Sequence, residues 1–391
     1  MVVERGVQEF HSVTISLLAM DMRGTAVRVG QPYFSRSDIA QINSQVSRVL
    51  RSGWLTSGKF VADFERRFGR MVGTKYAVAV NSGTAALHTI LSSLDLKSED
   101  EVIVPANTFV STVNSVFYVG AKPVLADCEI ETYNVSAETI EQVMTPRTRA
   151  VIVTHIAGNP CEMDPITKLC RDENLTLIED SAHAQGSKYK KKSCGSFGFG
   201  SAFSFYPTKV MTSAEGGMIT TDSEKLYGHS RLFRNVGRAA FGHGPIVVLG
   251  YNYRMSDIHA AIGLNQLSHL RKFVKKRNDL SRRYHEELRE LTWLQPQFIH
   301  SHSYSSFYAY IVMLSRGKSR ETIMNSLKRK GIETTVMFRP IHMQPYCTDK
   351  FRRVRCPNAE LIGKQSFALP LHVQMTSEEV KSVVRTLRRT I

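Results

Sequence analysis

Residues 76–86 read YAVAVNSGTAA, a short apolar run followed by a Ser-Gly-Thr turn and the beginning of a helical pattern. The run Tyr76–Val80 predicts a buried strand, and residues 85–94 predict a helix. Gly83 allows a tight turn between them, and the free N–H groups at the start of a helix form an anion site suited to a phosphate. Thr84 can add a hydroxyl donor. An ordinary helix N-cap is the alternative interpretation of this turn.

The same alternation of strand and helix continues on the C-terminal side of this segment, as far as about residue 222. We expect helices at residues 108–119 and 165–174, and strands at residues 101–104, 123–127, 150–154, 175–179 and 218–221. Strands that alternate with helices imply a mostly parallel sheet that is covered on both faces. The sequence therefore predicts an α/β fold class.

The C-terminal third has a different pattern. Residues 256–288 predict one long helix, amphipathic at first and highly charged later, that would connect two domains. An apolar run at residues 307–314 and a helix at residues 320–330 then indicate a smaller α+β domain. We expect an N-terminal extension at residues 1–30, a large domain at residues 31–270 and a small domain at residues 271–391.

The first thirty residues do not resemble a targeting signal. The apolar stretch at residues 13–20 is too short to span a membrane and follows no basic segment, so we expect neither a signal peptide nor membrane binding. A disordered extension, or a true start at Met20 or Met22, is the hypothesis that we prefer.

Composition narrows the function classes further. The six cysteines are scattered and form no C-x-x-C pair, which argues against a zinc or redox motif and fits a reducing cytoplasm. We expect no metal. The net charge of +16 favours anionic partners, but no nucleic-acid-binding motif accompanies it, so we expect a small anionic substrate on a solvated basic surface.

A second motif, LIEDSAH at residues 177–183, places Asp180 at the end of a buried strand. Ligands bind at this end of the strands in open α/β sheets. A carboxylate buried there needs a positive partner or several donors, because an unpaired buried charge is costly. A protonated pyridine nitrogen is one such partner; an N-cap and a metal ligand are the alternatives.

The third motif is FSFYPTK at residues 203–209, which is followed by EGG at residues 215–217. The neighbours of Lys209 are apolar or small, and a desolvated amine has a lowered pKa and can form an imine. A surface lysine is the alternative. Ser204 can be a second phosphate donor. The fourth motif, GYNYRMSD at residues 250–257, ends in a helix cap that does not explain Asn252 or Arg254.

In order and spacing, these motifs resemble the DegT–DnrJ–StrS sugar aminotransferases, which are fold-type I enzymes that use pyridoxal 5'-phosphate (PLP). The resemblance runs from about residue 32 to the C-terminus and also includes WLTSG at residues 54–58 and PANTF at residues 105–109. It implies an aspartate-aminotransferase-like fold with a large PLP domain. Phe199, Thr335 and Arg339 depart from the family, which more often has Asp, Arg and Tyr at these positions.

The resemblance also implies a role for each matching residue. Lys209 matches the lysine that forms a Schiff base with PLP, and Asp180 matches the acid that pairs with its ring nitrogen. Phe109 matches the aromatic residue that stacks on the ring; a core phenylalanine is the alternative. His183 matches a residue beside the ring's phenolic oxygen; a loop histidine with its bonds satisfied is the alternative. The residues that match phosphate contacts are Gly83, Thr84 and Ser204.

Further residues would contact the substrate or the second subunit. Asn252 matches a residue that reaches the cofactor phosphate of the neighbouring subunit, which implies a homodimer with shared active sites. His342 matches a residue beside the sugar, and Arg254 and Arg339 are our candidates for contacts with a diphosphate.

The implied reaction moves an amino group from an amino acid, for which we expect glutamate, to a keto-sugar nucleotide. Because Lys209 is kept, we expect amino transfer, not the dehydration catalysed by relatives with histidine there. Residues 331–334 and 339–346 favour C4 of the sugar over C3. An aminotransferase for a cyclitol or another cyclic ketone, and a PLP-binding regulator without catalysis, are the alternatives.

Overall fold

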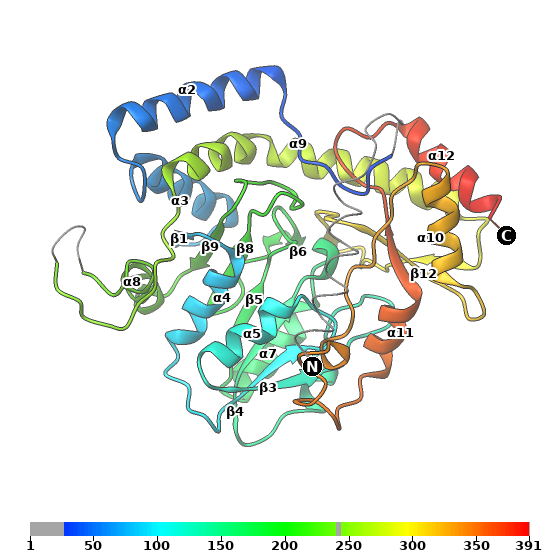
Figure 1. Cartoon of the computed structure of the whole chain (residues 1–391). Helices are drawn as coiled ribbons and strands as arrows, with labels where there is room; N and C mark the ends of the chain where they lie inside the picture. The colour runs from blue at the N-terminus through cyan, green and yellow to red at the C-terminus, as the bar shows by residue number, and fades with distance from the viewer. Residues whose placement is uncertain (1–26, 240–243, 391) are drawn as a thin grey trace, which may run out of the picture.

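The computed structural model describes residues 27–239 and 244–390, and a seven-stranded sheet forms its centre (Figure 1). The strand order is β1-β9-β8-β5-β4-β2-β3. Strand β9 runs antiparallel to both of its neighbours, and the other pairs are parallel. The predicted mostly parallel sheet is confirmed. The strand bounds are β1 (Tyr76–Val80), β2 (Glu101–Pro105), β3 (Lys122–Ala126), β4 (Thr148–Thr154), β5 (Thr176–Asp180), β8 (Gly200–Ser204) and β9 (Gly217–Thr221).

Helices cover both faces of this sheet, as the alternation of residues along β2 shows. Val102 and Val104 pack in the same apolar core as residues of α4 (Gly83–Ser92) and α5 (Val110–Tyr118). Ile103, between them, packs on the opposite face with residues of α6 (Ala137–Glu141) and α7 (Met163–Asp172). Successive strand residues point to opposite faces, so a strand that is apolar throughout must be covered on both.

Helix α9 (Asp257–Leu288) is 32 residues long and runs along one side of the molecule (Figure 1). Its predicted start is confirmed, because the Ser256 hydroxyl accepts hydrogen bonds from the backbone N–H groups of Ile258 and His259. It packs against α2 (Arg36–Ser52) and α3 (Lys59–Val72) near its start and against α12 (Ser377–Arg388) near its end. The predicted domain boundary at residue 270 therefore falls inside one continuous helix.

The C-terminal part has its own sheet and apolar core. Strands β10 (Leu294–Pro296), β12 (Tyr310–Leu314) and β13 (Ser366–Leu369) are antiparallel, and α12 and α10 (Arg320–Arg329) contribute to the core beside them. A second small sheet joins this part to the large domain: β11 (Ser303–Tyr304) pairs with β6 (Lys188–Tyr189), which pairs with β7 (Lys192–Ser193). In sequence order, α8 (Glu224–Phe233) follows β9 of the large domain, and α11 (Pro357–Gln365) comes directly before β13.

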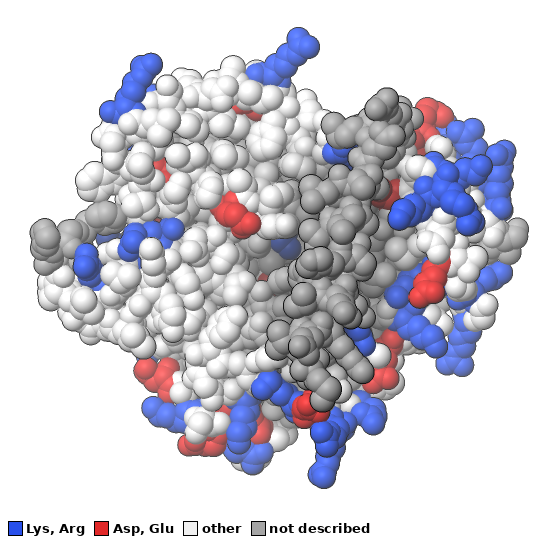
Figure 2. Space-filling view, in the orientation of Figure 1, with Lys and Arg blue, Asp and Glu red and all other residues white. Residues whose placement is uncertain are grey.

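Part of the sequence prediction falls on segments that are not described. The apolar stretch at residues 13–20, the alternative start sites and most of the predicted extension lie outside the described residues. Within residues 27–239 and 244–390, no helix is long and apolar enough to cross a membrane. Figure 2 shows that Lys and Arg side chains gather over the C-terminal helices, at the right of the view, and along the lower edge, whereas the surface over α4 and α5 carries few charges.

Candidate active site

A cavity of about 490 Å³ opens at the carboxyl ends of the parallel strands. Its wall includes Ser82 and Gly83 after β1, Thr154 at the end of β4, Asp180 at the end of β5 and Ser204 at the end of β8. The carboxyl ends of parallel strands meet at one edge of a sheet, where open α/β folds bind their ligands. Four segments that are far apart in the sequence therefore meet around one space.

Asp180 is the acidic group of this cavity. Its side chain is buried, and it accepts hydrogen bonds from the Thr112 hydroxyl (2.8 Å) and the backbone N–H of Ala182 (3.1 Å). Burial raises the pKa of the Asp180 carboxyl above its ordinary value, although both donors oppose this shift. A cation placed against this carboxylate would relieve the cost of burial. The site therefore fits a protonated ring nitrogen.

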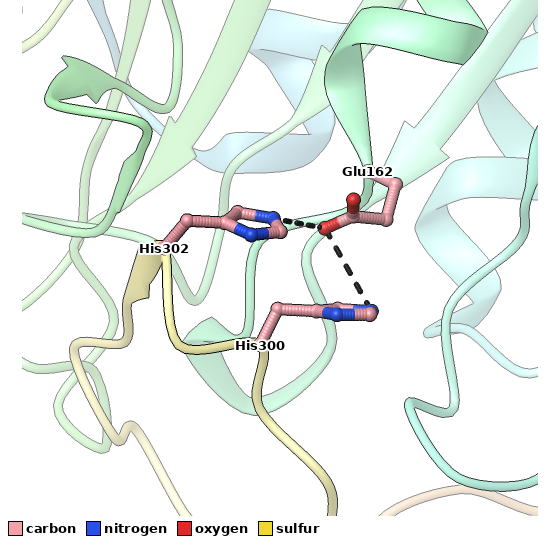
Figure 3. Close-up of side chains that lie close together, drawn as sticks. All are labelled: Glu162, His300 and His302. Atoms are coloured by element: carbon pink, nitrogen blue, oxygen red, sulfur yellow. Dashed lines mark hydrogen bonds and ion pairs between the residues drawn. The ribbon is translucent and has the colours of Figure 1, made fainter.

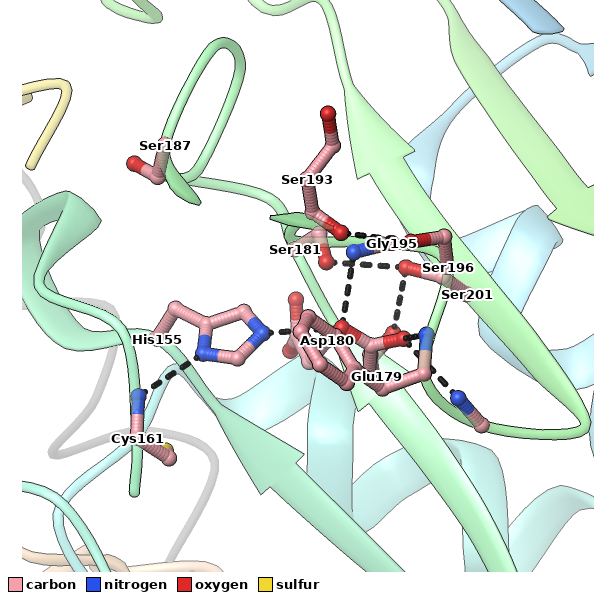
Figure 4. Close-up of polar contacts among 12 residues, drawn as sticks. His155, Cys161, Glu179, Asp180, Ser181, Ser187, Ser193, Gly195, Ser196 and Ser201 are labelled. Atoms are coloured by element: carbon pink, nitrogen blue, oxygen red, sulfur yellow. Dashed lines mark hydrogen bonds and ion pairs between the residues drawn. The ribbon is translucent and has the colours of Figure 1, made fainter. Parts of the chain in front are cut away.

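The neighbouring acid, Glu179, is also buried and lies on the opposite face of β5, because successive strand residues point to opposite faces; Figure 4 shows its polar contacts. It accepts hydrogen bonds from His155 Nε2 (3.1 Å) and from the backbone N–H groups of Gly195, Phe197 and Gly198. Burial raises the pKa of this carboxyl, but the His155 hydrogen bond and the backbone donors outweigh it and hold the pKa below the ordinary value. Glu179 thus anchors the loop that follows β7, and Asp180 is the buried acid that lines the cavity.

Lys209 is the basic group of the cavity and lies in the loop between β8 and β9. Burial lowers the pKa of its amine to about 8, although the negative charge of Asp180 opposes this shift. Its Nζ atom lies 4.8 Å from the centre of the Tyr308 ring. An amine with a lowered pKa is partly neutral near physiological pH and is therefore a nucleophile.

His183 faces the same cavity and has an unused nitrogen. Its ring stacks on Tyr308, with centroids 4.1 Å apart and planes 12° apart. Among the described residues, its buried Nδ1 atom has no hydrogen-bond partner. Burial lowers the pKa of His183 well below its ordinary value, so the ring is neutral. The alternative of a loop histidine with its bonds satisfied does not fit, and a ligand atom in the cavity could complete the missing bond.

The turn between β1 and α4 forms another part of the cavity wall. The Ser82 hydroxyl accepts a hydrogen bond from the backbone N–H of Ala85 and so caps α4, as the alternative interpretation of this turn proposed. A Cβ atom at Gly83 would lie only 2.9 Å from Cβ of Ser204, so glycine lets the start of the helix approach the end of β8. Thr84 also lines the cavity, with its hydroxyl 2.7 Å from that of Ser111. Hydroxyls and a helix N-terminus together suit a phosphate.

Phe109 lies at the mouth of the cavity, directly before α5. Its side chain is 58% exposed, which excludes the alternative of a core phenylalanine. An exposed aromatic ring beside a cavity can stack on a planar ligand.

Four predicted residues do not line the cavity. Asn252 and Arg339 are exposed, and Arg254 donates a hydrogen bond to Asn235 Oδ1 (3.0 Å). His342 is buried and its Nε2 lies 2.9 Å from Glu360 Oε1. Their roles toward a substrate or a second subunit stay predictions.

Two residues of the site were missed in the sequence. Thr112 lies one helical turn after Phe109, and this spacing is the only signal for its contact with Asp180. Tyr308 belongs to the apolar run at residues 307–314, but β12 begins only at Tyr310 and leaves Tyr308 in a loop that faces Lys209. No local pattern distinguishes such a tyrosine from one in a strand.

Comparison with known proteins gives consistent matches over almost the whole chain. Residues 36–388 match the DegT/DnrJ/EryC1/StrS aminotransferase family. GDP-perosamine synthase of Escherichia coli O157:H7 is 36% identical over 353 residues, which are 89% of this chain and 95% of that protein.

Solved structures agree with the sequence matches. PseC of Helicobacter pylori, an aminotransferase involved in the biosynthesis of pseudoaminic acid, superposes with a TM-score of 0.89 at 28% identity and covers 94% of this chain and 99% of its own. The PLP form of Spr1654 from Streptococcus pneumoniae gives a TM-score of 0.87 at 29% identity, covering 93% of this chain and 98% of that chain.

Proposed function

Because the chain belongs to the DegT/DnrJ/EryC1/StrS family of PLP-dependent aminotransferases, we propose that it moves an amino group from glutamate to C4 of a keto-sugar nucleotide. The observation that carries the proposal is the cavity that brings together Lys209, with its lowered pKa, and the buried carboxylate of Asp180. The similarity to GDP-perosamine synthase supports a nucleotide-sugar as the acceptor.

Each group in the cavity has a part in this chemistry. PLP, when bound, supplies an aldehyde that captures amines and a cationic ring that accepts an electron pair. Asp180 would hold the proton on the ring nitrogen. His183 would donate a hydrogen bond to a ring oxygen, and Gly83, Thr84 and Ser204 would hold the phosphate. Lys209 Nζ, whose pKa of about 8 lies near the working pH, is suited to taking a proton from the substrate carbon and returning it.

The outer part of the cavity would receive the sugar. Its wall there is made of Tyr308, Thr335, Met337 and Phe338, a mostly apolar surface with two hydroxyls. Pockets of this kind suit a sugar ring whose nucleotide remains outside. We place the diphosphate near the basic Arg254 and Arg339 and the sugar near His342. Residues 331–334 and 339–346 support C4 over C3 on sequence alone.

The active form would be a homodimer with shared sites. Several large apolar side chains are exposed: Trp54, Phe109, Tyr118, Leu249 and Tyr251. His88 contacts the rings of both Tyr118 and Tyr251, so these two belong to one surface. This surface includes the sparsely charged region over α5 in Figure 2, as expected for the core of an obligate interface. Asn252 follows Tyr251 and would reach the partner's phosphate site from there.

The substrate assignment is tested by supplying glutamate with a panel of acceptors: 4-keto and 3-keto nucleotide-sugars, the corresponding free sugars, and a cyclitol ketone. We expect 2-oxoglutarate to form fastest with a 4-keto nucleotide-sugar. A preference for the 3-keto acceptors would contradict the C4 assignment alone. Equal turnover of the cyclitol ketone or the free sugars would contradict the nucleotide-sugar assignment.

Shared sites can be tested by mixing two inactive variants. In a mixed dimer, the Asn252→Ala subunit keeps Lys209 and the Lys209→Ala subunit supplies Asn252, so one site is intact. Random pairing makes half of the dimers mixed, and we expect about a quarter of the wild-type activity to return. Each variant alone, refolded or co-expressed in the same way, is the control. Activity that does not exceed the mean of these two controls would show that each site lies within one subunit.

A further inference from the structure

Two histidines and a glutamate, none of which lines the cavity, bring their ligand atoms together (Figure 3). His300 and His302 lie between β10 and β11, and Glu162 is the residue directly before α7. Their ligand atoms all lie within 4.8 Å of one another, and no other group of this kind occurs among residues 27–239 and 244–390. The sequence prediction of no zinc site rested on the cysteines and did not consider this set.

Both imidazoles converge on one carboxylate oxygen. His302 Nε2 lies 2.8 Å from Glu162 Oε1, and His300 Nε2 lies 3.7 Å from the same atom. The two rings are stacked, with centroids 5.2 Å apart and planes 17° apart, so their nitrogens face the same way (Figure 3). The His302 contact is a hydrogen bond, whereas the His300 distance is too long for one. Both nitrogens are nevertheless close enough to the carboxylate to share an ion with it.

A tetrahedral zinc ion would use all three groups. Zinc binds histidine nitrogen and carboxylate oxygen at about 2.0–2.2 Å, which places ligand atoms about 3.3 Å apart. The three groups need only small side-chain rotations to reach that spacing from their present distances. Two histidines with one carboxylate leave a fourth position for water, a ligand set that zinc accepts.

The surroundings hold the ligands in place. The His302 ring meets Tyr189 edge to face at 5.3 Å, and the His300 ring meets Phe298 in the same way at 5.0 Å. The nearby ammonium of Lys190 is paired with Asp164 (2.7 Å), so it adds no unbalanced positive charge. Such contacts fix the orientation of metal-binding rings.

We propose that Glu162, His300 and His302 form a binding site for a divalent transition metal, with zinc as the expected ion. The site would fasten the segment that leads into the small domain to the start of α7 in the large domain, beside the pairing of β11 with β6. Its role is structural, and it does not depend on which substrate the aminotransferase uses.

Calorimetric titration of zinc into untagged, chelator-treated holoenzyme tests the site directly. We expect one zinc ion per chain, and at least a tenfold loss of affinity in the double variant His300→Ala/His302→Ala. The control is His259→Ala, which removes a partly exposed histidine of α9 that lies outside the cluster. All six cysteines are buried and should not compete for the ion. Magnesium should not bind, because it prefers oxygen ligands.

Thermal unfolding gives a second readout. At a zinc concentration a hundredfold above the dissociation constant, the wild-type melting temperature should rise by about 3 °C, and that of the double variant should not change. Because His300 and His302 are partly exposed, the double variant should fold and keep its melting temperature without metal. Equal zinc affinity in the double variant, or no zinc binding by the wild type, would overturn the proposal.

Discussion

Replacing Lys209 with alanine should lower amino transfer at least about 10³-fold while PLP still binds through its phosphate. In the proposed reaction the amine would have two tasks that no neighbour can assume: it would capture the aldehyde of PLP, and its Nζ atom would move the proton. Lys209 is the only lysine that lines the described cavity. Asp180 lies on the same cavity wall, but its carboxylate cannot form the covalent link.

The variant Lys209→Arg tests whether the positive charge of Lys209 alone is sufficient for activity. Arginine keeps the positive charge and most of the length, but its guanidinium does not lose its proton in proteins. If the charge of Lys209 were all that mattered, the arginine variant would remain active. We expect it to be as inactive as the alanine variant, and Lys97→Ala, at an exposed position after α4, to have wild-type turnover.

Borohydride reduction checks the covalent link without relying on turnover. Reduced wild-type protein should carry the PLP label on the peptide that contains Lys209, and the alanine variant should carry none. The capture of PLP by the apo-protein should also depend on pH. Only the neutral amine attacks, and its pKa is lowered to about 8, so the capture rate should rise with pH and level off above about 8. A rise that continues to pH 10 would show an ordinary lysine, and a label on another lysine would refute the assignment.

The strands and helices that surround this site were predicted well, because the sequence patterns that indicate them are local. The strand Tyr76–Val80 and the beginning of α10 at Arg320 were predicted to the residue. Most other ends differ by one to three residues, and the predicted helix at residues 108–119 begins later, at Val110. Helix ends depend on capping and packing, which local patterns describe less well.

Contacts between distant segments were harder to predict. Tyr308 meets His183 and Lys209 only because the loop before β12 folds over the large domain. In the same way, Glu162 and His302 lie far apart in the sequence and meet only in the folded chain. The motifs identified His183 and Lys209 but neither Tyr308 nor the two residues of the second contact, which only tertiary packing brings together.

The choice between the two acids at the end of β5 follows from the alternation of side chains along a strand. Glu179 and Asp180 are adjacent in a strand, so their side chains must point to opposite faces. The backbone N–H groups that follow β7 satisfy Glu179, whereas Asp180 has only two donors and a raised pKa. The acid with the raised pKa and fewer hydrogen-bond donors is the one that lines the cavity.

Asp180→Asn should therefore lower turnover by about 10²- to 10³-fold, the size of effect seen when one preorganised electrostatic group is removed from a site. Asparagine has the same shape; its amide oxygen can accept the hydrogen bond from the backbone N–H of Ala182, while its NH2 group can donate to the Thr112 hydroxyl in place of the bond that the carboxylate accepts. It lacks the negative charge that keeps a proton on the ring nitrogen, so the ring would accept electrons poorly. Steady-state turnover with glutamate measures the loss. Thr112→Val removes one hydrogen bond and keeps the carboxylate, so it should cost only about tenfold.

The unfolding temperature of the Asp180→Asn variant distinguishes a loss of catalysis from a folding defect. An acid whose pKa is raised by folding disfavours the folded state once the pH exceeds its unfolded pKa, because the folded protein must then hold a costly charge. The asparagine variant carries no such charge, so its apo-protein should unfold at pH 7 at the same temperature as the wild type or at a higher one. PLP should stabilise the variant less than it stabilises the wild type, because the charge pair with the ring is lost. An asparagine variant with turnover within threefold of the wild type would show that the ring nitrogen needs no acid, and the role of Asp180 would have to be abandoned.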